Sequence, residues 1–288
     1  MPPDDVHVRP MTEGDTAGVF ALCRSVLFDE IQPAEEQLSA LRFAARSAHL
    51  LATDPGGTWV AEHDGAIAGV AMSLLREGIW GLSLFAVAAD LRGRGVGREL
   101  LEASLRYGHD AGAHGWIIMS SEHPGALRRY LSAGLELHPA VGAAGVPDLR
   151  RAPDTVCRAV DAGTNGVSLA DAIGRDVRGA GLGRDLPVLL AAGARLLLVE
   201  DRAVVVARGA HVLALAARDD DAASIALWAA LTTAPRGATA SVDCITGAQQ
   251  WAIRVCRDAR LDLTPDGPLL TRGRLGPLTP YLPSGAYL

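Results

Sequence analysis

The stretch LFAVAADLRGRGVGRELL, residues 84–101, joins an apolar run, a loop of alternating glycine and arginine, and a helical pattern. The apolar run predicts a buried strand, and the apolar residues after the loop recur at helical spacing. The first turn of a helix offers unpaired backbone N–H groups and a partial positive charge. Glycines 93, 95 and 97 let that backbone approach a ligand, and three arginines add positive charge. The stretch therefore predicts a phosphate or pyrophosphate site.

Three types of phosphate-binding loop can be compared with this one. A P-loop needs Gly-Lys followed by Ser or Thr, and the chain contains no lysine. The dinucleotide pattern G-x-G-x-x-G also fails, because Arg98 or Leu100 stands where its third glycine belongs. The pattern R-x-x-G-x-G fits residues 92–97, between a strand and an amphipathic helix. The alternative is a glycine-rich turn with solvated arginines.

With this signature, residues 6–137 resemble the GNAT superfamily of N-acetyltransferases. The resemblance implies that acetyl-CoA binds here, with its pyrophosphate on Arg92, Gly93, Arg94, Gly95, Val96, Gly97 and Arg98. It also implies that the pantetheine arm hydrogen-bonds to the main chain of Phe85, Ala86 and Val87, as an added strand would. Many members carry a proline where Ala88-Ala89 stands here. We expect that difference to change a turn preference without abolishing binding.

A second motif, HPGALRRYLSAGL at residues 123–135, resembles the superfamily block N-x-x-A-x-x-x-Y-x-x-x-G-F. Ala126, Tyr130 and Gly134 stand in register, while His123 replaces the asparagine and Leu135 the phenylalanine. The resemblance implies that Tyr130 gives a proton to the departing thiolate. A phenol titrates at about 10, close to an alkyl thiol, so the transfer is nearly isoenergetic. The alternative for Tyr130 is a core aromatic on a helix face.

The general base is less well defined. Glu122 and His123 follow a predicted strand end and are candidates, and a chain of water molecules is an equal alternative. His123 is also expected to contact the cofactor or to cap a helix, and His63 to be solvated in a hairpin turn. The resemblance places substrate recognition near residues 27–36. Four acidic residues stand there: Asp29, Glu30, Glu35 and Glu36. They are expected either to attract a cationic amine or to belong to an ordinary solvated loop.

Composition limits the class of function. The chain has 288 residues, of which 49% are hydrophobic, and a formal net charge of -6, so nothing global indicates nucleic-acid binding. Its four cysteines form no C-x-x-C pair and no zinc-type spacing, which predicts free thiols in a reducing cytoplasm and no metal site. No signal peptide or membrane span is recognisable, so we expect a cytoplasmic protein without a membrane partner.

The first half of the sequence predicts a mixed α/β fold. Strands are expected at residues 6–10, 80–89 and 115–121, and residues 58–75 as a hairpin with His63-Asp64-Gly65 as its turn. Helices are expected from a cap at Asp15 to about residue 28, over 33–51, after the glycine loop, and over 123–137. Residues 138–155 are expected to hold a last strand and then a linker.

After this linker the sequence repeats itself. VAEHDGAIAGVA (60–71) is echoed by LLVEDRAVVVA (197–207), FAVAAD (85–90) by LALAAR (213–218), and AGLEL (133–137) by ARLDL (259–263). The offset is 128 residues between Phe85 and Leu213 and 126 between Ala133 and Ala259. The sequence thus predicts two tandem GNAT-like domains, residues 1–150 and 151–288, each a mixed central sheet flanked by helices.

The second domain is predicted to lack the chemistry of the first. The offset of 128 puts Asp220-Asp221-Ala222-Ala223 in place of the first loop residues, with Asp219 beside them. Each carboxylate about 4 Å from a pyrophosphate charge costs about 4 kcal/mol at an effective dielectric of about 20. The offset of 126 puts Cys256, expected to be a buried structural thiol, in place of Tyr130. The tail, residues 276–288, is expected to be an extended strand across the domain interface.

Together with these patterns, the resemblance implies an N-acetyltransferase that moves acetyl from acetyl-CoA to a primary amine of a small molecule or peptide, by direct attack. No nucleic-acid or membrane partner is expected, and a homodimer is a candidate assembly. One alternative is a catalytically inactive CoA-binding regulatory or scaffold protein, in which Tyr130→Phe would change nothing. Another is a different acyl donor or a larger metabolite as acceptor.

Overall fold

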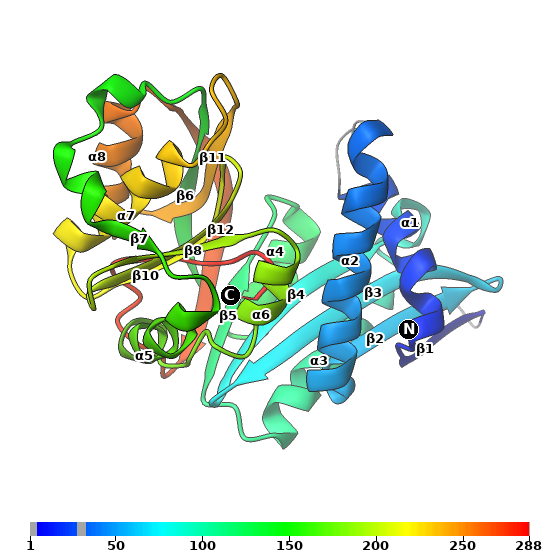
Figure 1. Cartoon of the computed structure of the whole chain (residues 1–288). Helices are drawn as coiled ribbons and strands as arrows, with labels where there is room; N and C mark the ends of the chain where they lie inside the picture. The colour runs from blue at the N-terminus through cyan, green and yellow to red at the C-terminus, as the bar shows by residue number, and fades with distance from the viewer. Residues whose placement is uncertain (1–4, 28–32, 288) are drawn as a thin grey trace. The chain divides into compact units, whose positions relative to one another are not determined.

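The structure, a computed structural model, describes residues 5–27 and 33–287 (Figure 1). By compactness the chain divides into two units, Met1–Ala113 (unit 1) and His114–Leu288 (unit 2). Compactness and sequence repetition are different properties, so the domain boundary at residue 150 stays a prediction. Within the described ranges, every helix is too short or too polar to cross a bilayer.

Unit 1 contains an antiparallel sheet with the strand order β1-β2-β3-β4. Its strands are β1 (Val6–Pro10), β2 (Thr58–His63), β3 (Ala66–Arg76) and β4 (Ile79–Val87). Its helices are α1 (Thr16–Val26), α2 (Pro33–Thr53) and α3 (Val96–Asp110). Asp64 and Gly65 close the β2–β3 hairpin with φ angles of 50° and 72°, the left-handed geometry of a tight two-residue turn. The hairpin and the strand, loop and helix predicted from the sequence are confirmed.

Helix α3 covers one face of this sheet, and α1 and α2 lie together on the other (Figure 1). Phe20 of α1 and Phe43 of α2 join those two helices, with ring centroids 5.3 Å apart. Helix α3 approaches the sheet closely at Gly69, where a Cβ would lie 2.8 Å from Cδ1 of Leu100. Helix and sheet share a buried cluster made of Ala61, Ala68, Ala71, Leu91, Val96 and Leu100. Apolar burial of this kind anchors the N-terminal half of α3 to the sheet through Val96 and Leu100.

A buried ion pair links three elements of unit 1. Asp54, directly after α2, is 1% exposed and binds Nη1 of Arg76 at 2.8 Å. The same carboxylate accepts the Leu75 N–H at 2.8 Å and the Tyr107 hydroxyl at 2.9 Å. Because these groups come from the end of α2, from β3 and from α3, the network fixes the three elements together.

Asp15 does not cap α1 with its side chain, contrary to the sequence expectation. Both of its carboxylate oxygens are bound by the Arg9 guanidinium at 2.8 Å, and one also accepts the Thr12 N–H at 2.7 Å. Arg9 reaches Glu62 as well, at 2.9 Å. The bidentate charge-assisted contact with Arg9 is stronger than a single cap bond. The Asp15 carboxylate also forms a capping box with Thr12 at the short 3-10 turn Glu13–Asp15, which precedes α1.

Unit 2 contains a sheet with the order β5-β12-β6-β11-β10-β9-β8-β7, in which β10 and β11 are parallel and β13 pairs with β10. The strands are β5 (Gly115–Met119), β6 (Glu136–Gly145), β7 (Ala159–Asp161), β8 (Arg195–Val199), β9 (Ala203–Arg208), β10 (His211–Ala217), β11 (Ala240–Thr246), β12 (Asp262–Gly273) and β13 (Tyr281–Leu282). The helices are α4 (Pro124–Ser132), α5 (Val167–Arg178), α6 (Leu186–Ala191), α7 (Asp220–Thr232) and α8 (Gln250–Asp258). Residues of α7 and α8 form one large buried cluster with β8 to β11.

The element order of the second sequence half repeats that of the first. Both halves read strand, two helices, three strands, helix, strand, helix, strand, from β1 to β6 and from β7 to β12. Helices α4 and α8 coincide at an offset of 126, since Pro124 corresponds to Gln250 and Ser132 to Asp258. The repetition predicted from three short echoes is therefore present in the fold.

Strands β6 and β12 are exchanged between the two halves. Strand β12 lies between β5 and β6, pairing Leu269 with Met119 on one side and Asp262 with Ala144 on the other. Strand β6 in turn lies between β12 and β11. Each half thus inserts its last long strand into the sheet of the other, which gives the second half a structural role in completing the first.

Candidate functional site

The predicted site residues divide between the units. The cofactor-binding set from Phe85 to Arg98 lies in unit 1, and Glu122, His123 and Tyr130 lie in unit 2, where they share the α4 region. Each group has its own geometry.

The glycine loop joins β4 to α3 with left-handed backbone at two of its glycines. Gly93 has a φ of 81°, and Gly95, the N-cap of α3, a φ of 92°. Within residues 5–27 and 33–287, no backbone acceptor receives the N–H of Gly95, Val96 or Gly97. These donors lie at the positive end of the α3 dipole, and a Cβ at Gly93 would meet no heavy atom within 4 Å. Such a helix terminus is suited to an anion.

The three loop arginines are exposed, and their charges are not equally engaged. Nε of Arg92 donates to the Val87 carbonyl at 3.2 Å, and Nε of Arg98 pairs with Glu102 at 2.8 Å. The Arg94 side chain makes no ion pair or hydrogen bond with any residue that the structure describes. Arg94 therefore carries the most available charge of the loop.

Strand β4 is antiparallel to β3 and contains a bulge. Phe85, Ala86 and Val87 pair with Ala71, Val70 and Gly69. The register shifts between Met72 and Ser73, so Ser83 is an extra residue on β4. Arg46 of α2 holds this bulge by donating to the carbonyl and hydroxyl oxygens of Ser83. The sequence carries no signal for this contact, because nothing local marks a bulge.

Tyr130 is on α4 and is 3% exposed. Burial raises the pKa of its phenol well above the ordinary value, because the charged form is desolvated. The C-terminal end of α4 is held by Arg272 of β12, whose Nη1 donates to the Ala133 carbonyl at 2.6 Å. The Arg272 guanidinium also stacks on Trp116, 4.0 Å from the ring centroid. A residue of the second half thus positions the helix that carries Tyr130.

His123 caps helix α4. Its Nδ1 accepts the Gly125 N–H at 3.1 Å, so one of the three sequence expectations for this residue, a helix cap, is met. A neutral imidazole that accepts at Nδ1 carries its proton on Nε2. Glu122, next to it, is exposed, and the described part of the chain offers it no hydrogen bond or ion pair.

The remaining expectations concern the surface. His63 is not simply solvated: its Nε2 lies 2.7 Å from a carboxylate oxygen of Asp5. One potential metal-ligand atom from each of Asp5, His63 and Asp64 lies within 4.8 Å of the other two. Exposed acidic groups are often arranged in this way in proteins that bind no metal at the position. Of the acidic residues near the first helices, Asp29 and Glu30 lie outside the described residues. Glu36 is paired with Arg24, and Glu35 is exposed.

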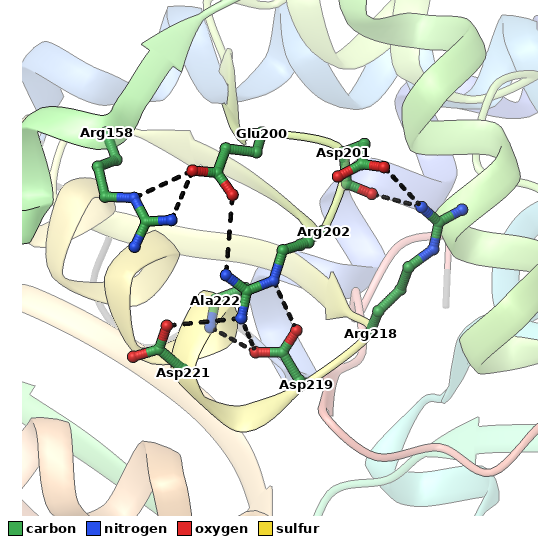
Figure 2. Close-up of polar contacts among 8 residues, drawn as sticks. All are labelled: Arg158, Glu200, Asp201, Arg202, Arg218, Asp219, Asp221 and Ala222. Atoms are coloured by element: carbon green, nitrogen blue, oxygen red, sulfur yellow. Dashed lines mark hydrogen bonds and ion pairs between the residues drawn. The ribbon is translucent and has the colours of Figure 1, made fainter.

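The corresponding place in the second half has a different construction. Residues 88–95 separate β4 from α3, whereas only residues 218 and 219 separate β10 from α7. The glycine loop is therefore deleted there, which corrects the expectation that carboxylates replace it residue by residue. Asp219 caps α7 by accepting the Ala222 N–H at 2.9 Å, and Arg202 binds its two oxygens at 2.8 and 2.6 Å (Figure 2).

The second half also lacks a counterpart of Tyr130. At the offset of 126 the equivalent residue is Cys256, which is fully buried, and burial raises the pKa of its thiol to about 12. The expectation of a buried structural thiol is confirmed.

Comparisons with known proteins agree with this fold. Residues 24–135 match the sequence model of the acetyltransferase (GNAT) family. A putative acetyltransferase from Pyrococcus horikoshii has a TM-score of 0.81 at 14% identity, covering 100% of this chain and 98% of that one. A GCN5-related N-acetyltransferase from Sphaerobacter thermophilus has a TM-score of 0.58 at 14% identity, covering 96% and 98%. A GCN5-related N-acetyltransferase from Kribbella flavida has a TM-score of 0.60 at 16% identity, covering 93% of this chain and 72% of that one.

No curated protein gives a significant match to the chain. Residues 24–135 thus match the acetyltransferase (GNAT) family model, and the similarity to solved structures over the whole chain confirms the predicted tandem GNAT-like fold.

Proposed function

We propose that the chain is an N-acetyltransferase that takes acetyl from acetyl-CoA and gives it to a primary amine of a small molecule or peptide. The observation that carries the proposal is the N-terminus of α3, where three backbone N–H groups have no backbone acceptor among the described residues and the Arg94 side chain has no ion-pair partner there. These groups suit the pyrophosphate of acetyl-CoA, and the main chain of Phe85, Ala86 and Val87 is proposed to bind its pantetheine arm. We place the activity in the cytoplasm.

The proposed reaction is a direct transfer. The amine lone pair attacks the thioester carbonyl, the C–N bond forms, and the C–S bond breaks to release the CoA thiolate. Tyr130 is the proposed donor of the proton that the thiolate takes up, and burial keeps this phenol protonated at neutral pH. Apolar surroundings also raise the pKa of a thiol, so the pKa values of the phenol and of the CoA thiol differ less than the raised pKa of Tyr130 alone suggests.

The proton lost by the amine needs an acceptor. In the neutral state His123 uses its Nδ1 lone pair to cap α4, so its Nε2 carries a hydrogen and suits a contact to the cofactor better than proton abstraction. Glu122 is exposed and has no partner among the described residues, so it remains the proposed base, directly or through water.

Calorimetric titration with acetyl-CoA, followed by an assay of thiol release with a panel of amines, tests the proposal. We expect one binding site per chain. Arg94→Ala should weaken binding about tenfold or more, since a charge-assisted hydrogen bond to phosphate is lost. Arg106→Ala is the matched control, because Arg106 is also exposed on α3 but lies away from its N-terminus. Absence of acetyl-CoA binding would overturn the proposal.

Tyr130→Phe separates the two candidate functions. For an acetyltransferase with Tyr130 as acid, kcat should fall roughly 10²- to 10⁴-fold while acetyl-CoA affinity is preserved. The rival, a CoA-binding regulatory or scaffold protein, would bind acetyl-CoA, release no thiol with any amine, and be unaffected by Tyr130→Phe. An unchanged kcat in an active enzyme would instead remove Tyr130 from the mechanism.

A further inference from the structure

Strands β4 and β10 can be aligned residue by residue through a shared bulge. On β4 the extra residue is Ser83, and on β10 it is Leu213, where the register with β9 shifts between Val212 and Ala214. Both strands continue for the same distance and end at Val87 and Ala217. Leu215, Ala216 and Ala217 are therefore the structural equivalents of Phe85, Ala86 and Val87.

These three residues of β10 have a partner within the same chain. Strand β11 pairs with β10 only at His211 and Val212, before the bulge. Beyond the bulge the partner is β13: Leu215 pairs with Leu282, Ala216 with Tyr281, and the Ala217 N–H donates to the Pro280 carbonyl at 3.1 Å. The main-chain positions that are proposed to bind the pantetheine arm in the first half are thus occupied by the C-terminal tail in the second.

Gln249 fastens this tail at two points. Its Nε2 donates to the Leu278 carbonyl at 2.7 Å, and its Oε1 accepts the Tyr281 N–H at 3.0 Å. Trp251 holds the amide in this orientation by donating to the same Oε1 at 2.9 Å. Gln249 precedes α8 as His123 precedes α4, at the offset of 126. The equivalent of a predicted cofactor contact is therefore a contact to the tail.

Helix α5 supplies the second attachment. The Leu278 N–H donates to the Val177 carbonyl and the Gly276 N–H to the Arg178 carbonyl, both at 2.9 Å. The buried guanidinium of Arg178 donates to the Tyr287 carbonyl at 3.0 Å. Tyr281 and Leu282 are each 2% exposed, so the tail is part of the interior of unit 2. A segment bound at this many points is a fixed part of the fold.

The position of the pyrophosphate is filled in the same manner. The Asp219 carboxylate accepts a backbone N–H at the N-terminus of α7, where the first half leaves such donors unpaired (Figure 2). Arg202 binds this carboxylate bidentately and so neutralises its charge. An anion arriving here would have to displace a group that is already hydrogen-bonded and paired.

We propose that the tail, residues 276–287, is a built-in occupant of the second half. Strand β13 stands in the place of the cofactor arm and Asp219 in the place of its pyrophosphate, so the chain has one cofactor site and the second half is closed by its own sequence. The comparison with the cofactor arm rests on the proposed function. The seating of the tail on β10 does not.

Hydrogen exchange of the full chain, with and without CoA as the probe, tests this inference. In the free protein the Ala217 amide should exchange slowly, because it is bonded to the tail. CoA should slow exchange across residues 84–98 and leave residues 214–222 unchanged. Rapid exchange at Ala217, or slowing of residues 214–222 by CoA, would overturn the proposal.

Two variants isolate the role of Gln249. Gln249→Ala removes both bonds to the tail and should speed exchange across residues 214–218 and 278–282 about tenfold or more. Gln250→Ala is the matched control, since this neighbouring glutamine is exposed and its side chain donates to the Gly247 carbonyl, outside the tail. Gln249→Met keeps the length of the side chain and removes both bonds without burying a charge, so it tests the same contacts if Gln249→Ala fails to fold. If the Gln249 variants exchanged no faster across residues 214–218 and 278–282 than Gln250→Ala does, the proposal would be contradicted.

The outcomes distinguish the two proposals of this protein. If CoA alters exchange nowhere in the chain, the acetyltransferase proposal fails, while the glutamine variants still decide whether the tail is seated on β10. If CoA protects residues 84–98 but the Gln249 variants bind two CoA molecules per chain, the second half retains a usable site beneath the tail. The tail is then a removable cover, and the inference of a permanent closure is overturned.

Discussion

Gly134 and Arg260 end equivalent helices with the same left-handed backbone, at φ angles of 81° and 63°. The chain turns from α4 into β6 at the first and from α8 into β12 at the second. Glycine adopts this conformation without strain, whereas an arginine places its Cβ against the neighbouring carbonyl. The repeat has kept the turn and lost the residue type that suits it.

Replacing Arg260 by glycine should therefore stabilise the protein. We expect Arg260→Gly to raise the free energy of unfolding by about 1 kcal/mol, and Gly134→Ala to lower it by about the same amount. Arg260 is exposed, so little else is lost with its side chain. Urea unfolding at constant slope measures both, and a neutral or destabilising Arg260→Gly would contradict the strain argument.

Of the four cysteines, one should react in the native protein. Cys157 is exposed, whereas burial raises the pKa of Cys23, Cys244 and Cys256 to about 12. A chromogenic disulfide reagent at about pH 8 should titrate one thiol rapidly and the others only in denaturant. Cys157→Ser should abolish the rapid phase. Two or more rapid thiols would show that a buried site opens readily.

Stability should fall in acid partly through Asp15. The Arg9 guanidinium holds the pKa of this carboxyl well below its usual range in the folded state, while the unfolded chain titrates near 3.8. The contribution is therefore present above about pH 4 and is lost as the pH falls below it, because protons then bind preferentially to the unfolded chain.

The check is the free energy of unfolding at pH 5 and pH 3 for the wild type, Asp15→Asn and the exposed control Asp110→Asn. The stability gap between the wild type and Asp15→Asn should narrow at the lower pH. A gap that stays constant would show that the ion pair with Arg9 does not contribute.

The buried pair of Asp54 and Arg76 should be sensitive to removal of one partner. Arg76→Met leaves a carboxylate at 1% exposure without its ion-pair partner, and we expect a loss of roughly 3–5 kcal/mol. Asp54→Asn combined with Arg76→Met should recover part of that loss. Arg98→Met, which breaks the exposed pair with Glu102, is the control and should cost less than about 1 kcal/mol. The free energies of unfolding of the wild type, Arg76→Met, the double variant and Arg98→Met, measured in denaturant, test this prediction.

The features that could be predicted from the sequence are those with local signals. The Asp64-Gly65 turn, the glycine loop after β4 and the helix from Pro124 depend on residues a few positions apart. The tandem fold followed from echoes at a nearly constant offset. That constancy also concealed the deleted loop. The offset between the halves is 130 residues at the bulges of Ser83 and Leu213, but only 126 at helices α4 and α8. The deleted residues therefore lie between the bulge and the last helix, a difference that the sequence echoes, at offsets of 128 and 126, did not reveal.

Long-range pairing accounts for what the sequence could not predict. The tail was expected to be an extended strand across the domain interface, but its strand β13 comprises only Tyr281 and Leu282 and pairs with β10 inside unit 2. That partner is not encoded in the tail's own pattern. Arg272, which positions the helix of Tyr130, lies in a strand that sequence order assigns to the other half. Asp15 follows Arg9 instead of the local cap rule because a bidentate ion pair outweighs one backbone bond.

The strand exchange has a consequence for how the chain is made. Met119 of β5 pairs with Leu269 of β12, so about 150 residues must still be synthesised after β5 has emerged before its edge is covered. At about 5–20 residues per second, the ribosome leaves that edge open for roughly 8–30 seconds. An unpaired sheet edge is a template for aggregation. The order of translation thus sets a period in which this edge of β5 is exposed, and the period ends only when β12, the last long strand, has been synthesised.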